Sequence, residues 1–262
     1  MQIDHFIHLP YTLAGFAVGA LVGLTGVGGG SLMTPLLVLL FGIHPATAVG
    51  TDLLYAGITK FSGCAVHHRK GSIDWSVARR LAAGSVPAAL ATLALLAHWG
   101  AQSGRSSATI SVILGYALFV TAIVLLFRPW LVARIQPAFA KLSERQILTL
   151  TVLLGLVLGV LVTISSVGAG AIGVTVLLML YPQMSTLRIV GSDIAHAVPL
   201  TLIAGAGHWA MGSVDWPMLV SLLLGSIPGI MIASHFAPLV PDRALRALLA
   251  FALVLAGAKL AF

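Results

Sequence analysis

Short motifs in the first half of the chain recur in the second half, in the same order. The pairs are VGGGS (27–31) and VGAGA (167–171), VGTD (49–52) and VGSD (190–193), GSIDW (71–75) and GSVDW (212–216), and GSVPA (84–88) and GSIPG (225–229). The offset is 140 residues for the first pair (27 to 167) and 141 for the others (49 to 190). This repetition predicts two halves built from the same series of elements.

The composition indicates that both halves lie in a lipid bilayer. Of the 262 residues, 59% are hydrophobic and only 8% are charged, whereas soluble domains carry about 25% charged residues. The chain is therefore expected to be a polytopic membrane protein with the bilayer as its main partner. Its net charge of +7 is read as a signal for orientation in the membrane, and no nucleic-acid partner is expected.

The apolar segments predict five helical elements in each half. Segments of spanning length lie at 46–67, 76–98, 107–127, 188–209, 217–236 and 243–262, and 11–25 and 146–164 are nearly long enough. The segments 31–41 and 171–181 would reach only about 16 Å, half the hydrocarbon core, and each follows a glycine run. The sequence thus predicts an all-α protein with a first repeat (1–127), an interfacial cytoplasmic linker (128–145) and a second repeat (146–262).

The positions of lysine and arginine predict that the two repeats are inverted. The first GSIDW loop is flanked by four basic residues, whereas its counterpart at 209–217 has none, so the two loops are expected on opposite faces. Both termini then lie on the outer, periplasmic side. This orientation places 11 of the 14 basic residues inside: Arg69, Lys70, Arg79, Arg80, Arg128, Arg134, Lys141, Arg145, Arg188, Arg243 and Arg246.

The two glycine runs are candidates for the halves of one anion site. A helix that restarts after a break has free amides with a partial positive charge, and glycine lets a ligand approach them. The candidate residues are Thr25, Gly28, Gly29, Gly30, Ser31, Ser165, Ser166, Gly168, Ala169 and Gly170. The alternative is that small residues only permit close helix packing.

Two acidic residues, Asp52 and Asp193, occupy equivalent positions in predicted spans, where ionisable groups are rare. Each shares a helix face with a polar residue three positions later, Tyr55 or His196. One interpretation is proton coupling, because carboxyl and imidazole groups can exchange protons. The other is structural, with each carboxylate receiving amides from the adjacent broken helix.

Lys60 is the only lysine well inside a predicted span. Its charge can balance a bound anion or pair with Asp52, or it can extend toward the interface. Cys64, the single cysteine, is either a small packing residue or the centre of a sulfur-transfer reaction. The first role is favoured, so no catalysis is expected.

The glycine-rich break GVGGGSLMTP at 26–35, the following GIHPATAVGTD at 42–52, and the repeat of both resemble the sulfite exporter TauE/SafE family. The resemblance covers about residues 11–260 and implies a bacterial inner-membrane permease for small anions, such as sulfite or organosulfur compounds. The second repeat departs from the first, with Ala169 for Gly29 and Thr175 for Pro35.

We therefore expect a secondary transporter that moves a small anion by alternating access. The alternative is a proton- or cation-coupled antiporter centred on Asp52 and Asp193. No cofactor and no metal site are expected, because no histidine and carboxylate set has ligand spacing on one helix. The sequence leaves open whether the chain forms a homo-oligomer.

Overall fold

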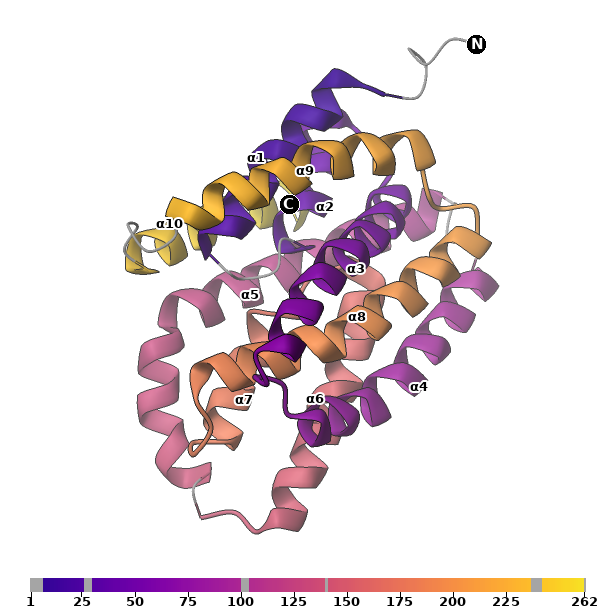
Figure 1. Cartoon of the computed structure of the whole chain (residues 1–262). Helices are drawn as coiled ribbons and strands as arrows, with labels where there is room; N and C mark the ends of the chain where they lie inside the picture. Colours follow the sequence, from indigo (N-terminus) through magenta and orange to yellow (C-terminus); the bar gives the residue numbers. More distant parts are fainter. Residues whose placement is uncertain (1–6, 26–29, 100–103, 140, 237–241, 262) are drawn as a thin grey trace.

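Every regular element in the described part of the chain is a helix, as a computed structural model shows (Figure 1). The structure describes residues 7–25, 30–99, 104–139, 141–236 and 242–261. In these ranges the helices are α1 (Leu9–Thr25), α2 (Gly30–Phe41), α3 (Pro45–Arg69), α4 (Trp75–Trp99), α5 (Gly104–Phe139), α6 (Glu144–Ser165), α7 (Ile172–Leu180), α8 (Thr186–Ala210), α9 (Trp216–Phe236) and α10 (Asp242–Ala261). The predicted all-α class is confirmed.

The helix lengths agree with a protein that crosses a membrane several times. Among the described residues, five helices are long and apolar enough to span a bilayer: Trp75–Trp99, Ile110–Phe139, Glu144–Ser165, Thr186–Ala210 and Trp216–Ala233. The two short helices are also present. With 12 residues in α2 and 9 in α7, they reach about 18 Å and 14 Å, well short of a core of about 30 Å.

The centre of the bundle is an antiparallel pair, α3 and α8, which lie side by side in Figure 1. The start of α3 meets the end of α8, because Gly50 lies against the backbone of Ser213. At the other end Gly191 lies in the same way against Ser72. A glycine is needed at both places, because a Cβ atom would collide with a backbone carbonyl.

The helices flanking this centre pack in equivalent pairs, α1 with α9 and α4 with α6. In the first pair, Gly15 approaches the backbone of Leu222, and in the second, Gly155 approaches that of Leu81. These contacts are related by the offset seen in the sequence, since 15 and 155 correspond, as do 81 and 222. The packing therefore repeats together with the sequence, while the inversion of the repeats in a membrane stays a prediction.

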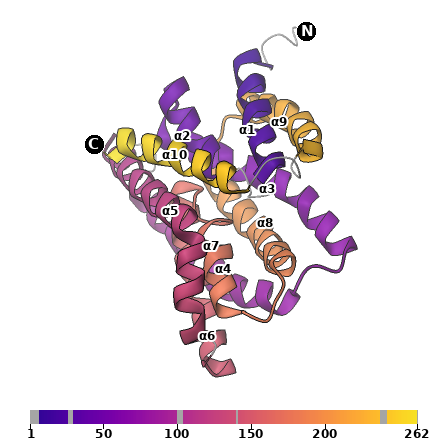
Figure 2. The ribbon, with the colours of Figure 1, turned by 90° about the vertical axis from the view of Figure 1, so that its left-hand side faces the viewer.

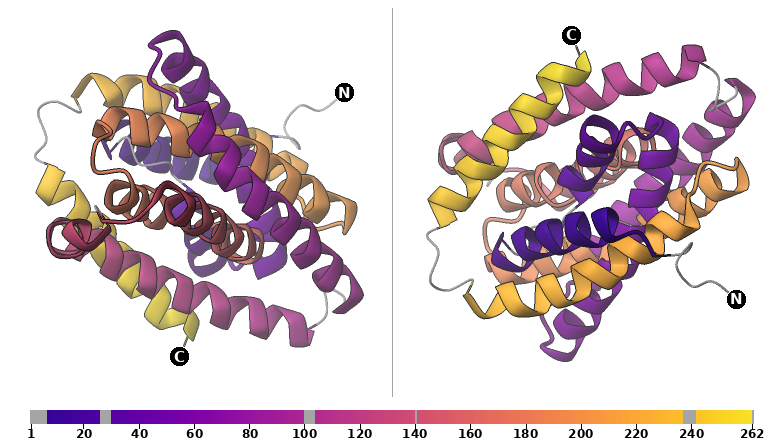
Figure 3. Two further views of the ribbon diagram at one scale, coloured as in Figure 1. Left: turned by 90° about the horizontal axis from the view of Figure 1, so that it is seen from below. Right: turned by 90° about the horizontal axis from the view of Figure 1, so that it is seen from above.

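A further layer consists of α5 and α10, which run together along one edge of the bundle in Figure 3. The short helices contact this layer, α7 against α5 and α2 against α10. The short helices are therefore held between the central pair and an outer pair of long helices. Unpaired backbone groups must be kept from lipid, and for the break before α7 this position is suited to that.

Helix α5 is longer than its predicted span at 107–127, because it continues to Phe139. It contains Pro129 and Pro137, which account for the change of direction visible in Figure 1. Figure 2 shows the end of α5 and the start of α6 projecting from the bundle. Residues 128–139 are thus helical, and their role as an interfacial linker stays a prediction.

Candidate transport site

Asp52 is fully buried on α3 and holds the short helix α2 in place. The backbone amide of Thr34 donates to Asp52 Oδ2 at 3.2 Å, and the Thr34 hydroxyl donates to the same oxygen at 2.5 Å. A charged acceptor strengthens both hydrogen bonds. This contact favours the structural interpretation of Asp52 and leaves its other oxygen, Oδ1, for a second role.

Ser166 brings the second break close to the Asp52 carboxyl group. It follows α6 in the left-handed backbone region, with φ of 57°, and its side chain is buried. The hydroxyl lies next to the Asp52 carboxyl group. Among the described residues, however, neither Asp52 Oδ1 nor Ser166 Oγ has a hydrogen-bond partner. Each half of the chain therefore contributes one buried, unpaired polar atom to this region.

The rest of the second break is largely satisfied within itself. Gly168 and Gly170 have φ values of 115° and 98°, which explains why glycine occurs at both positions. The amides of Ile172 and Gly173 donate to the Gly168 carbonyl at 3.1 and 3.4 Å. These two amides of α7 are therefore not free for an anion, contrary to the simplest form of the anion-site hypothesis.

Two other predicted residues of this break serve its packing. Ser165 is buried, and its hydroxyl donates to the Leu161 carbonyl at 2.6 Å and accepts from the Val167 amide at 3.2 Å. Ala169 packs in the apolar core between α3 and α8. Ser166 is thus the hydroxyl of this break that remains available.

Asp193 repeats the position of Asp52 at the other short helix. It is buried on α8, close to the backbone amide of Gly170 and packed against Gly173. A Cβ atom at Gly173 would collide with the Asp193 carboxylate. The partial positive charge at the start of α7 is therefore compensated by a carboxylate of the protein itself.

Lys60 supplies a positive charge within electrostatic reach of both carboxylates. Its side chain is buried, with 9% exposed, and it makes no ion pair or hydrogen bond with the described residues. The structure thus brings Lys60, Asp52 and Asp193 together, as two acids and one base near the middle of the bundle. Extension of Lys60 toward an interface stays the alternative interpretation.

Tyr55 on α3 and His196 on α8 occupy equivalent positions, and His196 connects α8 to its flanking helix. His196 Nε2 lies 2.8 Å from the Ser85 hydroxyl on α4, with donor and acceptor set by the tautomer. Tyr55 lies next to Ser226 on α9, and Ser226 corresponds to Ser85 by the repeat offset. His196 therefore connects α8 to α4, whereas the Tyr55 hydroxyl has no hydrogen-bond partner among the described residues.

The first glycine break falls mostly outside the described residues. Gly28 and Gly29 are not described, nor are the side chains of Thr25 and Ser31, and Gly30 begins α2. Their predicted role stays a prediction. The sequence analysis also missed Thr34. A threonine one turn into a short apolar helix could have indicated a polar contact there.

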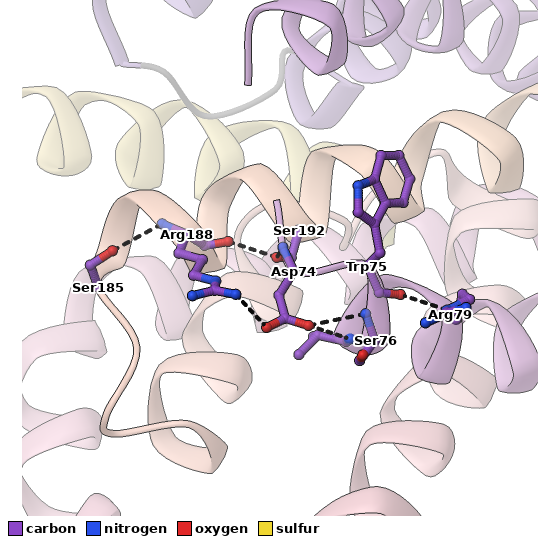
Figure 4. A network of polar contacts seen from close by, with 8 residues as sticks. Asp74, Trp75, Ser76, Arg79, Ser185, Arg188 and Ser192 are labelled. Carbon is purple, nitrogen blue, oxygen red and sulfur yellow. Dashed lines mark hydrogen bonds and ion pairs between the residues drawn. The ribbon is translucent and has the colours of Figure 1, made fainter. Parts of the chain in front are cut away.

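Docked loops close both ends of the central pair. At one end, the Asp74 amide donates to Ser192 Oγ at 2.8 Å and Asp74 pairs with Arg188 at 3.1 Å (Figure 4). At the other end, the Asp215 amide donates to Thr51 Oγ1 at 3.0 Å. The repeat offset aligns Arg188 with Thr47, which carries no charge, so the second loop lacks an equivalent ion pair.

Cys64 packs against the apolar cluster of Ile73, Ala78 and Ala195. No group of three or more metal-binding side chains occurs in the ranges that were described. The cysteine therefore lies among apolar neighbours, as expected for a packing residue.

Comparison with known proteins assigns the chain to a family. The model of the family described as sulfite exporter TauE/SafE matches residues 11–260. The chain belongs to the TauE/SafE family. The resemblance expected from the glycine-rich motifs is thereby confirmed.

Curated relatives in this family are described as membrane transporters. "Probable membrane transporter protein YjnA" of Bacillus subtilis is 41% identical over 251 residues, covering 95% of this chain and 97% of the relative. "Probable membrane transporter protein YdhB" of the same organism is 28% identical, covering 94% and 97%. No solved structure gives a significant match. Together with its apolar helices, these relatives establish this TauE/SafE protein as a multi-pass membrane transporter.

Proposed function

We propose that this transporter moves a small anion, sulfite or an organosulfur compound such as a sulfonate, across the bacterial inner membrane. The family description supports sulfite as a cargo. The observation that carries the proposal is Lys60, a buried lysine without an ion-pair partner among the described residues, within electrostatic reach of Asp52 and Asp193. A buried cation of this kind favours binding of an anion.

The charge balance of the centre limits when an anion can bind. Asp52, Asp193 and Lys60 together carry one net negative charge if all three are ionised. An anion beside two ionised carboxylates is repelled, so we expect one carboxyl group to be protonated when the cargo binds. Lys60 and the hydroxyl of Ser166 can then contribute to its binding, with help from the first glycine break.

Alternating access is the mechanism that fits the repeated packing. Residues 1–127 and 146–262 are taken as the inverted repeats, joined by a cytoplasmic linker at 128–145, with both termini in the periplasm. The antiparallel α3 and α8, and the docked loop at each end of the pair, support this assignment. Undocking one loop at a time would open the centre to one side and then to the other.

The proposal is tested by binding and flux of sulfite and isethionate, using purified protein in detergent and in liposomes. We expect each cargo anion to raise the melting temperature, because a ligand of the folded state stabilises it. Lys60→Gln should weaken this binding about tenfold or more, since a hydrogen bond to a charged group contributes about 1.5–3 kcal/mol. Lys141→Gln, an exposed residue, is the matched control. Unchanged anion affinity in Lys60→Gln would reject the proposed role of this lysine.

The second candidate is a proton- or cation-coupled antiporter centred on Asp52 and Asp193. The two buried carboxylates, which flank one lysine, favour this alternative. In that case a sodium or proton gradient alone would drive exchange, and sulfite and isethionate would neither bind nor accelerate it. Anion flux that requires no counter-cation would exclude the antiporter.

A further inference from the structure

We propose that His208 is a positioning residue that couples the docked loop at 211–215 to the second glycine break. The loop at the opposite end of the central pair, 70–74, is instead held locally. This inference rests on the proposed transport function, and it states which of the two loops changes the shape of the candidate site when it undocks.

His208 lies in the last turn of α8, and its ring reaches the end of α6. The side chain is fully buried, and its Nε2 atom lies 2.9 Å from the backbone carbonyl oxygen of Thr163. Because a carbonyl oxygen only accepts hydrogen bonds, the Nε2 atom carries a hydrogen and is the donor. The hydrogen bond therefore joins α8 to α6 through the side chain of a single residue.

The Thr163 carbonyl is open to this donor because α6 ends there. In a continuing helix the Val167 amide would donate to it, but that amide donates to the Ser165 hydroxyl oxygen at 3.2 Å. The last carbonyls of a helix have no partner within the helix, and a buried one that stays unpaired costs free energy. His208 therefore completes the hydrogen bonding at the point where the second break begins.

The same histidine also holds the loop that follows α8. The Ser213 amide donates to the His208 carbonyl at 2.8 Å, and Gly50 of α3 lies against both residues. The loop is docked on α3 at a second point, where the Asp215 amide donates to Thr51 Oγ1 at 3.0 Å. His208 thus contacts the loop through its backbone and the end of α6 through its ring.

The equivalent histidine of the first repeat, His67, makes a different contact. The Ser72 amide donates to its carbonyl at 3.0 Å, and Gly191 lies next to its ring, as the repeat predicts. Its Nδ1 atom, however, lies 2.8 Å from the Ser72 hydroxyl, so the side chain bonds within its own loop. The ion pair of Asp74 with Arg188 holds this loop further. One loop is therefore tied to a break, whereas the other is tied to itself and to α8.

Undocking of the loop at 211–215 should therefore loosen the second break at the same time. When the loop leaves α3, the end of α8 is freed to shift, and the hydrogen bond from His208 to Thr163 is lost. Ser166, three residues farther along the chain, lies next to the Asp52 carboxyl group, so the change reaches the candidate site. In the assigned orientation this loop is the periplasmic one, so opening toward the periplasm alters the second break.

Hydrogen–deuterium exchange of the purified protein, measured by mass spectrometry with no anion present, tests this coupling. One peptide covers the break at 163–173 and another covers the loop at 211–216, and both contain hydrogen-bonded amides. His208→Leu removes the donor and should accelerate exchange in both peptides by about two- to tenfold, as expected for the loss of one hydrogen bond. His208→Gln keeps an N–H donor on the side chain and should remain close to the wild type.

His67→Leu is the matched control, and it should accelerate exchange only in residues 68–76. Thr51→Val removes the hydroxyl that docks the loop and leaves His208 in place, so it decides the result if His208→Leu does not fold. It should accelerate exchange in the break peptide as well as in the loop peptide. In a His208→Leu background it should add nothing further in the break peptide, because the connection is already removed.

Three outcomes would overturn the inference: the break peptide is unchanged in His208→Leu, His208→Gln exchanges as fast as His208→Leu, or Thr51→Val accelerates only the loop peptide. Acceleration of the break peptide in His67→Leu would overturn it too, since the coupling would not belong to one loop. The cargo is judged separately, by the melting-temperature shift with isethionate. A shift without coupling would reject only the role of His208, whereas coupling without a shift would reject the anion cargo.

Discussion

At the scale of single residues, the repeat places chemically similar groups in unequal surroundings. Asp52 receives two hydrogen bonds from Thr34, whereas Asp193 packs against Gly173 at the start of α7. The sequence predicted both acids from their equivalent positions. It could not predict which hydroxyls face them, because that depends on how helices distant in sequence pack together.

Thr34→Val should destabilise the protein through loss of its hydroxyl hydrogen bond to Asp52. Because a buried carboxylate oxygen would lose a partner, we expect a cost of about 1–3 kcal/mol. Thr175→Val is the control, since the buried Thr175 hydroxyl only donates to the Ala171 carbonyl of its own helix. Melting temperatures in detergent measure the difference. Equal melting temperatures in the two variants would contradict the role given to Thr34.

Gly173→Ala should be destabilising, because its Cβ atom would collide with the Asp193 carboxylate. Forcing extra volume into a packed site costs about 1–3 kcal/mol. Gly63→Ala on α3 is the control, since its Cβ atom would meet Ile194 Cγ2 at an ordinary 3.8 Å. The melting temperature of Gly63→Ala should therefore be well above that of Gly173→Ala. A reversed or equal ranking would show that Asp193 does not pack closely against α7.

At the scale of elements, the sequence predicted the two short helices because their apolar segments are bounded by glycine runs and turns. It missed the extension of α5 to Phe139, since proline and arginine usually indicate the end of a span. The hydrogen bonds within the break at 165–173 were also not predictable. They depend on backbone conformations with positive φ, which no unique sequence pattern specifies. The docked loops at the ends of α3 and α8 differ by one ion pair.

Removing that ion pair should loosen only one of the loops. Arg188 is 52% exposed, so its pair with Asp74 contributes no more than about 1 kcal/mol. In a Cys64→Ala background, Arg188→Ala should increase thiol labelling of Ser72→Cys by about two- to fivefold. Labelling of the equivalent Ser213→Cys, in the loop at the opposite end, should not change. An equal increase at both sites would mean that Arg188 stabilises the whole protein and not one loop.

At the scale of the whole molecule, the paired packing of α1 with α9 and of α4 with α6 joins the two repeats. Each repeat supplies helices to the surroundings of the other, so a transport movement cannot be confined to one of them. The proposed inverted arrangement also places both chain ends on the same side of the membrane, the periplasmic side. Reporter fusions, which show on which side of the membrane a chain end lies, test this arrangement.

A reporter fused to the C-terminus should be exported. Because most basic residues lie in the segments assigned to the cytoplasm, we expect alkaline phosphatase at this end to be active and green fluorescent protein to be dark. A fusion truncated after Lys141, in the predicted cytoplasmic linker, should give the opposite pair of signals. A fluorescent C-terminal fusion would reverse the orientation and reject the assigned periplasmic ends.

The close approach of α1 to α9 also has a consequence for biogenesis. The glycines of α1 leave its backbone bare so that α9 can lie against it, yet α9 is synthesised only near the end of the chain. Helix α4 is likewise synthesised before its partner α6, but only α5 separates the two in the chain. A newly inserted first half must therefore remain in the lipid with unfilled grooves until its late partners arrive, and a chain cut short before α9 should be a substrate for membrane quality-control proteases.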